Sequence, residues 1–344
     1  MSFLKYQKQT PEFVNNFLKY KKYIEFGSQT TVDSEYFDLR TLLRFVKVYL
    51  YDKDNLYKIS KEDFRKIEIK NITLDDINRL NTFDLEKYII FLSVKLENDN
   101  KTRNRKLASC KRLFEYLEVN NLIDSNPTKN MSSARVEKRI PKYLSLNESK
   151  RLLAVTLKSK NMFNIRNYAI TCIFLNCSIR LSELTNIDLT DIKMDQSEKT
   201  IKIHGKGNKE RLLYLDDAAC EAINAYLEVR PSIGKDNKDY NALFLSARNK
   251  RISNRTVQVI IKDNLSKALD KNANIKDYKT HSLRHTGASL LYNENNTDIF
   301  VLKKILGHKS LEATQIYTHV SNKKLKDIMM NFAVSSLIEK NGGK

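Results

Sequence analysis

Apolar residues recur at steps of three and four along the first third of the chain. The clearest stripe comprises Leu107, Cys110, Leu113, Phe114 and Leu117. Such spacing places one apolar face along a single helix. The same periodicity predicts earlier helices over residues 13–26, 37–51 and 83–96, whereas residues 60–81 show no clear pattern. We therefore expect residues 1–128 to form an all-helical domain.

A basic segment with two prolines follows this helical region. The stretch "NPTKNMSSARVEKRIPKYLS" contains Pro127 and Pro141, and it carries five basic residues between Lys129 and Lys142 against one acidic residue, Glu137. Prolines and small polar residues favour a connection over a packed element. Residues 129–142 are therefore predicted to be a basic interdomain linker.

The pattern changes once in the second half of the chain. Residues 165–175 form an apolar helix, and Ile299, Leu302, Ile305 and Leu306 mark another that Gly307 should end. Between them, Ile201 and Ile203 alternate with lysines, a glycine-containing turn follows, and residues 212–215 return to apolar character. This alternation predicts a β-hairpin with Lys206 at its tip. The expected fold class is mainly α with a small β-sheet, and the second domain should span 143–322, followed by a tail over 323–344.

Charge adds a partner class to this picture. The 344-residue chain holds 61 Lys and Arg against 41 Asp and Glu, a formal net charge of +20, and most of that excess lies beyond residue 128. A basic excess of this size points to nucleic acid, although an AT-rich genome would also enrich lysine and asparagine. The apolar run near residues 169–175 is too short to span a membrane, and no secretory leader is evident. We expect a cytoplasmic protein that binds nucleic acid.

The sequence offers little for a metal or a cofactor. The four cysteines, Cys110, Cys172, Cys177 and Cys220, form no C-x-x-C pair and fall in apolar helical patterns, so we expect buried thiols. Gly205 and Gly207 match neither nucleotide-binding fingerprint. We therefore predict no metal site and no cofactor.

Three short segments carry candidate chemistry. In "HSLRHT", His281, Arg284 and His285 stand at positions i, i+3 and i+4, where a helix presents all three on one side. An arginine fork flanked by imidazoles suits a phosphate diester, although a single histidine in a helix is more often structural. In "SIRLSEL", Arg180 needs an anionic partner, and Glu183 could supply it as a purely structural pair.

The third segment, "LGHKSLEATQIYTHV", places His308 directly after the expected helix end and Tyr317 nine residues later. Tyr317 is one of 17 tyrosines, and it would not be singled out by itself. Together with "SIRLSEL", "HGKGNKER" and "HSLRHT", however, the sequence resembles the tyrosine recombinase (phage integrase) family, and within it the bacterial Xer-like proteins. The motifs occur in the family's order, and the resemblance covers residues 143–320 clearly and 80–128 more loosely.

The resemblance implies a role for each matching residue. Arg180 and Arg284 correspond to the arginines that grip the scissile phosphate, and His281 and His308 complete that pocket. Lys206 corresponds to the lysine that protonates the leaving 5′ oxygen, and Tyr317 to the nucleophile that forms a 3′-phosphotyrosyl bond. Glu183 and His285 would orient the pocket. The implied fold is a helical core-binding domain (SAM-like) and a mixed α/β catalytic domain that together clamp duplex DNA.

The implied partners are double-stranded DNA with a specific recombination site and further copies of the chain, as a tetramer on two sites with a Holliday junction intermediate. An accessory protein or a second recombinase is a further expected partner. For DNA contacts, basic residues of the first domain and linker are the candidates. They are Arg103, Arg105, Lys106, Lys111, Arg112, Arg135, Lys138 and Arg139. A merely solvated basic helix face remains open for the first five.

A C-terminal stripe suggests how copies would dock. Leu325, Ile328, Met329 and Phe332 stand at i, i+3, i+4 and i+7, and this stripe could pack on its own domain or on a neighbouring copy. Two other function classes also remain: a type IB topoisomerase-like enzyme and a non-catalytic DNA-binding regulator.

One departure from the family pattern has a physical consequence. Ser178 stands two positions before Arg180, where the family usually has glycine, and Ile179 replaces the common leucine. If the backbone at Ser178 needs a positive φ, a serine there is strained by about 1–2 kcal/mol. We expect an altered turn in an active enzyme.

Overall fold

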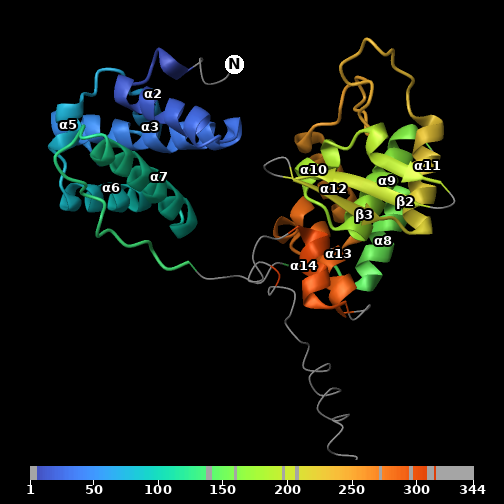
Figure 1. Ribbon diagram of the computed structural model, residues 1–344. Helices are drawn as coiled ribbons and strands as arrows, with labels where there is room; N and C mark the ends of the chain where they lie inside the picture. Colours follow the sequence, from blue (N-terminus) through green and yellow to red (C-terminus); the bar gives the residue numbers. More distant parts are fainter. Residues whose placement is uncertain are drawn as a thin grey trace, which may run out of the picture. The chain divides into compact units, whose positions relative to one another are not determined.

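The computed structural model describes residues 6–136, 142–158, 161–195, 198–205, 209–270, 273–293, 297–307 and 314. The chain divides into two compact units, Met1–Lys138 and Arg139–Lys344, and Figure 1 shows the elements of each. The division falls inside the segment predicted to be a linker. Each unit is described by itself.

The described part of the first unit consists of helices. In chain order they are α2 (Glu12–Lys19), the π-helical turn η1 (Tyr20–Ile24), α3 (Gln29–Tyr51), the 3-10 turn η2 (Lys53–Asn55), α4 (Lys61–Lys66), α5 (Leu74–Asn78), α6 (Thr82–Val94) and α7 (Asn100–Val119). The all-helical expectation for this region is confirmed over the described residues. The segment 60–81, which had no clear pattern, contains two helices too short to show a periodicity.

Side-chain caps fix where these helices begin. Ser28 accepts a hydrogen bond from the backbone N–H of Thr31 at the start of α3, and Asn81 and Asp84 form a capping box at the start of α6. Each cap satisfies a backbone donor that the first helical turn leaves unpaired. The helix predicted over 13–26 is interrupted, because the chain changes to π-helical hydrogen bonding at Tyr20.

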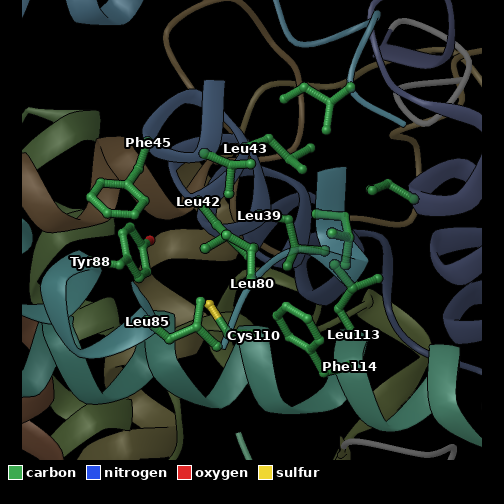
Figure 2. Packing of buried hydrophobic residues seen from close by; sticks show 14 of the residues in the cluster. Leu39, Leu42, Leu43, Phe45, Leu80, Leu85, Tyr88, Cys110, Leu113 and Phe114 are labelled. Carbon is green, nitrogen blue, oxygen red and sulfur yellow. The ribbon is translucent and has the colours of Figure 1, made fainter. Parts of the chain in front are cut away.

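The core of this unit lies between α3, α6 and α7. Figure 2 shows Leu39, Leu42 and Leu43 from α3 facing residues of the other two helices. From α6 come Leu85 and Tyr88, and from α7 come Cys110, Leu113 and Phe114, all of them buried. The apolar stripe predicted from the α7 sequence therefore lies on the core side of that helix, as its spacing required.

The first part of the predicted linker packs on this unit. Met131 is buried in the same core, the Lys111 ammonium donates to the Met131 carbonyl at 2.5 Å, and Asn104 exchanges hydrogen bonds with the backbone of Ala134 at 2.7 and 2.8 Å. Residues up to 136 thus extend the helical unit, because α7 supplies polar side chains that pair with their backbone. Lys138 and Arg139 lie outside the described residues.

The second unit combines helices with a small sheet. Its helices are α8 (Leu146–Thr156), α9 (Met162–Cys177), α10 (Leu181–Thr185), α11 (Asp217–Val229), α12 (Asn254–Ala268), α13 (Thr280–Asn293) and α14 (Ile299–Leu306), with 3-10 turns η3 (Leu189–Asp191) and η4 (Ile275–Asp277). Its strands are β1 (Ile192–Met194), β2 (Lys199–His204) and β3 (Glu210–Tyr214). The predicted fold class, mainly α with a small sheet, is confirmed.

The sheet is antiparallel in the order β1-β2-β3. Ile201 pairs with Leu213 across the hairpin and with Ile192 of β1, and the side chains of Ile201, Ile203 and Leu213 are buried. The predicted β-hairpin is therefore confirmed. Strand β1 escaped prediction because three residues are too few for an alternation to show.

Three further predictions concern the end of a helix, the cysteines and membrane-spanning helices. Gly307 ends α14 in the left-handed region, with φ 62°, as predicted. All four cysteines are free and buried, which also agrees with the sequence. Among the described residues, every helix is too short or too polar to cross a bilayer.

Candidate active site

The site is built around the turn between α9 and α10. Helix α9 ends at Ser178, whose backbone is left-handed (φ 49°, ψ 34°) and whose N–H still donates to the Phe174 carbonyl at 3.0 Å. The positive φ is the condition under which a serine was expected to be strained. Two residues after this turn begins, Arg180 is the N-cap residue of α10.

The Glu183 carboxylate is the centre of the site. It accepts hydrogen bonds from the backbone N–H and the guanidinium of Arg180, both at 2.8 Å. It also accepts a bidentate pair from Arg211, at 3.0 and 2.9 Å. Burial alone would raise the pKa of Glu183, but the Arg211 hydrogen bonds, those of Arg180 and the charge of Arg211 outweigh it and lower the pKa to about 2.

Arg284 joins three elements beneath this carboxylate. Its side chain is 1% exposed, and its guanidinium donates to the carbonyl of Ser178 and to the carbonyl of Leu306, each at 2.7 Å. A guanidinium nitrogen also lies 4.0 Å from a Glu183 oxygen. Arg284 therefore ties α13 to the end of α9 and to the end of α14. Arg180 differs, because 40% of its side chain is exposed.

The two histidines of α13 have different environments. His281 is exposed and His285 is buried, and their rings meet edge to face with centroids 4.7 Å apart. Desolvation first, and then the positive charges of Arg284 and Arg180, lower the pKa of His281. Neutral imidazole is thus favoured at His281 while no anion is bound.

Arg211 of β3 was not assigned a role from the sequence. Besides its two bonds to Glu183, its Nε donates to the carbonyl of Ile305 at 3.0 Å, and a Cβ placed on Gly307 would lie 3.3 Å from its guanidinium. Arg211 therefore connects the hairpin, the Glu183 carboxylate and the end of α14. Its signal in the sequence is its place as the last residue of the "HGKGNKER" motif.

Three of the predicted catalytic residues, Lys206, His308 and Tyr317, lie outside the described residues, and so do the docking residues Leu325, Ile328, Met329 and Phe332. The described neighbours of two of them belong to the site. A Cβ placed on Gly205, one residue before Lys206, would lie 3.9 Å from Glu183 Oε1. A Cβ placed on Gly307, one residue before His308, would lie 3.3 Å from the Arg211 guanidinium.

The end of the hairpin next to its turn carries its own ion-pair cluster. His204 Nε2 lies 2.9 Å from Asp191, and its Nδ1 lies 3.1 Å from Glu210. The hydrogen bond to Asp191 first, with the charges of Asp191 and Glu210, raises the pKa of His204 above its usual 6.5. This cluster ties β2 to β3 and to the η3 turn.

A cavity of about 630 Å³ lies beside His281. Its lining includes the cations Arg255 and Lys262 of α12 and Lys279 just before α13, together with the apolar Leu181. None of these cations was singled out from the sequence, because each stands alone in its local pattern. Their convergence next to His281 enlarges the positive region around Arg180.

The basic residues predicted on α7 are mostly paired inside their own unit. Arg105 and Lys106 both pair with the buried Asp38, Lys106 also donates to Thr41 at 2.9 Å, and Arg112 donates to Glu35 at 2.7 Å. The interpretation of Lys106 as part of an open basic face is wrong, since its side chain is only 10% exposed. Burial costs it so much hydration that a carboxylate partner is required.

Arg103, Arg105 and Lys111 differ from Lys106 in exposure. Arg105 keeps 49% of its side chain exposed despite its pairing, and Arg103 and Lys111 are half-buried. Arg135 is exposed, and its backbone carbonyl accepts a hydrogen bond from Asn100 at 3.0 Å. Contact of these residues with DNA stays a prediction.

Comparison with known proteins places these features in a family. Residues 142–324 match the model of the phage integrase family. The chain is 40% identical over 331 residues to a tyrosine recombinase XerC from Caldanaerobacter subterraneus subsp. tengcongensis, covering 95% of this chain and 87% of the relative. It is 31% identical over 296 residues to tyrosine recombinase XerC from Thermodesulfovibrio yellowstonii, covering 85% and 94%.

Solved structures show the same fold. The XerH site-specific recombinase in a post-cleavage complex with palindromic difH substrate matches with a TM-score of 0.64 at 21% identity, over 93% of this chain and 94% of that one. A lambda integrase dimer bound to a COC′ core site matches with a TM-score of 0.62 at 13% identity, over 88% and 95%.

Proposed function

Because the chain belongs to the phage integrase family and is a tyrosine recombinase, we propose that it breaks and rejoins DNA at a specific site through a 3′-phosphotyrosyl intermediate. The observation that supports this best is the convergence of Arg180 and Arg284, from distant segments, on the Glu183 carboxylate. A scissile phosphodiester bound there would meet two permanent positive charges.

Arg180 and Arg284 would stabilise the transition state. Negative charge builds up on the non-bridging oxygens as the phosphate becomes five-coordinate, and preorganised donors aimed at those oxygens lower the barrier. In other phosphoryl transfers a single arginine is worth roughly 10³–10⁵ in rate. Arg284 is preorganised by its two carbonyl contacts, and Arg180 by Glu183.

His281 would add a hydrogen-bond donor whose protonation responds to substrate. Its pKa is lowered in the free protein by desolvation and by the two arginines. A phosphate bound beside it offsets part of the positive charge of the arginines and therefore raises that pKa. DNA binding would therefore draw a proton onto His281 and strengthen its hydrogen bond to the phosphate.

We assign the covalent steps to the residues that follow Gly205 and Gly307 in the motifs. Tyr317 would attack the phosphorus, and Lys206 would protonate the departing 5′ oxygen, while His308 completes the pocket. A phenol with a pKa of about 10 is roughly 4 kcal/mol from full ionisation at neutral pH, which is why the cationic pocket is needed. The tyrosyl ester keeps the energy of the broken bond, so a 5′ hydroxyl of another strand can reverse the attack.

The proposed partner is duplex DNA, in agreement with the structural neighbours that are solved on DNA. Exchange of four strands between two sites requires four active copies, and we propose a tetramer on two DNA sites with a Holliday junction between cleavage rounds. The C-terminal residues 323–344 would dock each copy on the next. An accessory protein or second recombinase would set direction.

A trapping experiment tests this function. Bound sites are first selected from random duplex DNA, and the selected site is then nicked near the cleavage position so that the 5′ product diffuses away. The chain should accumulate a covalent DNA adduct, and Tyr317→Phe should abolish it. Tyr214→Phe is the matched control, because that hydroxyl sits on an exposed side chain of β3, and it should leave the adduct unchanged.

The outcomes separate the function classes. A regulator that only binds DNA would give no adduct with any variant. A topoisomerase-like enzyme would relax supercoiled plasmid lacking the selected site, and it would lose that activity with Tyr317→Phe.

A further inference from the structure

A hollow of about 320 Å³ lies in the first unit, between α3 and the segment 66–70. Its lining contains five cations, Lys8, Arg40, Arg44, Lys66 and Lys70, and one acidic residue, Glu68. We call it the α3 hollow. It is distinct from the basic face predicted on α7, where Arg105, Lys106 and Arg112 already have carboxylate partners in Asp38 and Glu35.

Two arginines one helical turn apart dominate the α3 hollow. The Arg44 Nε donates to the Ile67 carbonyl at 3.0 Å, and the Arg40 guanidinium stacks over the ring of Phe37 at 4.9 Å and that of Tyr36 at 5.4 Å. Within the described ranges, neither arginine forms an ion pair with a carboxylate. Burial, and next the like charge of Arg40, lower the pKa of Arg44 to about 10. Both guanidinium groups therefore line the hollow with N–H donors that no described carboxylate occupies.

Tyr36, one of the residues that line the hollow, has a buried hydroxyl with no partner among the described residues. Tyr36 is 2% exposed, with its ring stacked on Tyr6 at a centroid distance of 4.3 Å. Buried hydroxyls are nearly always satisfied. An acceptor supplied from outside would meet both this O–H and the arginine donors.

We propose that the α3 hollow binds a phosphate group, with Arg40 and Arg44 as the charged donors and Tyr36 as a neutral one. Planar guanidinium forks match phosphate oxygens bidentately, and a phenol donates one further bond without adding charge. The group we assign is a backbone phosphate of the DNA, and only this choice of source rests on the proposed function. The first unit would then hold DNA through α3 as well as, or in place of, α7.

The salt dependence of DNA binding tests the proposal. Binding of the full-length chain to a short duplex of random sequence is measured over a range of salt concentrations. Each phosphate contact contributes about −0.9 to the slope of log K against log salt. Arg40→Gln/Arg44→Gln should make the slope shallower by about 1 and weaken low-salt binding by roughly tenfold. Tyr36→Phe should weaken binding a few-fold and leave the slope unchanged, since no charge is removed.

A charge-matched control distinguishes a specific contact in the α3 hollow from the overall positive charge of the first unit. Lys19→Gln/Lys58→Gln removes two positive charges from exposed positions of the same unit and should change the slope by less than half as much. Equal changes in the two double variants would overturn the proposal. Arg40→Gln alone keeps the Arg44 bond to Ile67 and should still weaken binding if the double variant fails to fold. Full wild-type affinity of both Arg40→Gln and Tyr36→Phe would also overturn it.

Melting temperatures identify whether the bound phosphate comes from DNA or from free phosphate. Inorganic phosphate should raise the melting temperature of the wild-type chain less than an equal concentration of phosphate groups in duplex DNA does. A rise with inorganic phosphate that Arg40→Gln/Arg44→Gln abolishes, together with an unchanged DNA slope, would overturn the assignment to DNA. Because the duplex is random and no cleavage is measured, the result does not depend on the covalent adduct of Tyr317.

Discussion

At the scale of single residues, Arg211 limits the competition between Glu183 and a substrate phosphate for the same arginine donors. A carboxylate 4.0 Å from Arg284 and 2.8 Å from Arg180 competes with a substrate phosphate for the same guanidinium donors. Arg211 occupies one lone pair on each Glu183 oxygen. Its own charge also offsets the carboxylate, so a net positive charge remains for the phosphate. This pairing is the main reason that the pKa of Glu183 is lowered to about 2.

Replacement of Arg211 by methionine should therefore slow cleavage without abolishing binding. Glu183 would turn to Arg284 and Arg180, and its pKa would rise, because burial would no longer be outweighed. We expect the rate of adduct formation to fall about tenfold or more, equal to about 1.4 kcal/mol or more of barrier, with DNA affinity changed by less than about threefold. Single-turnover cleavage and binding assays at neutral pH measure both.

Two further variants make this prediction specific. Glu183→Gln in the Arg211→Met background should recover part of the lost rate, because the competing charge is gone. A double variant slower than either single variant would contradict the competition. Arg251→Met is the control, since Arg251 pairs with Asp188 in the same unit at 2.5 Å.

Glu183 should also give the unfolding free energy a defined pH dependence. Its folded pKa of about 2 lies below the usual 4.5, so the unfolded chain takes up the proton first as pH falls. The stabilisation is complete above about pH 4.5 and is lost progressively between 4.5 and 2. The difference in unfolding free energy between wild type and Glu183→Gln should stay constant from pH 7 to 5 and shrink below that. Urea denaturation at each pH measures it, and a difference that grew toward acid pH would contradict the assignment.

Ser178 offers a gain in stability. Its φ of 49° is costly for any residue with a Cβ, and its hydroxyl is buried with no hydrogen-bond partner in the described chain. Ser178→Gly should stabilise the second unit by about 1 kcal/mol, as measured by chemical denaturation. Ser182→Gly, in an exposed position of α10, should instead destabilise it, because glycine is unfavourable inside a helix. A loss of stability with Ser178→Gly would refute the strain.

At the scale of elements, the site depends on the close contact of α9 and α13. A Cβ on Gly287 would lie 2.4 Å from the Leu175 carbonyl and 2.4 Å from the Ser178 hydroxyl. Only glycine therefore lets α13 approach the end of α9, and this approach brings the Arg284 guanidinium to the Ser178 carbonyl. The contact sets the distance between the two arginine-bearing segments.

Gly287→Ala should therefore disturb both stability and cleavage. The backbone oxygen of Leu175 cannot move aside cheaply, so α13 must shift, and overpacking of this kind costs about 1–3 kcal/mol. Adduct formation should fall further than stability alone explains under conditions where the variant is folded. The control is Ala288→Gly, which relieves contacts in place of adding them. Cleavage by Gly287→Ala at the wild-type rate would show that the arginine spacing is not critical.

At the scale of the whole molecule, the proposed function requires several copies acting together. The stripe at Leu325, Ile328, Met329 and Phe332 is the proposed docking element, and the proposed catalytic residues precede it in the chain. Removal of residues 323–344 should leave binding to a single site intact and abolish the pairing of two sites. Gel-shift assays with one and with two sites distinguish these steps, and normal pairing by the truncated chain would refute docking through this segment.

The amino-acid sequence by itself determined the fold class, several of the longer helices, the hairpin and the family. These follow from local information: helical periodicity over ten residues or more, alternation in a strand, and four short motifs in a fixed order. The pairing of Arg180 with Glu183 could also be foreseen, because the two are only three residues apart. Very short elements such as β1 and α5 could not, since three to five residues carry no period.

The tertiary structure decided which charges meet. The burial of Lys106 on Asp38, the bidentate contact of Arg211 with Glu183, and the contact of Arg44 with the Ile67 carbonyl all join segments distant in the chain. A local pattern can place a cation on one face of a helix, but the free energy of a charge depends on its hydration and on the nearest opposite charge. Both are set only when the elements pack, so the identity of the free cations had to come from the structure.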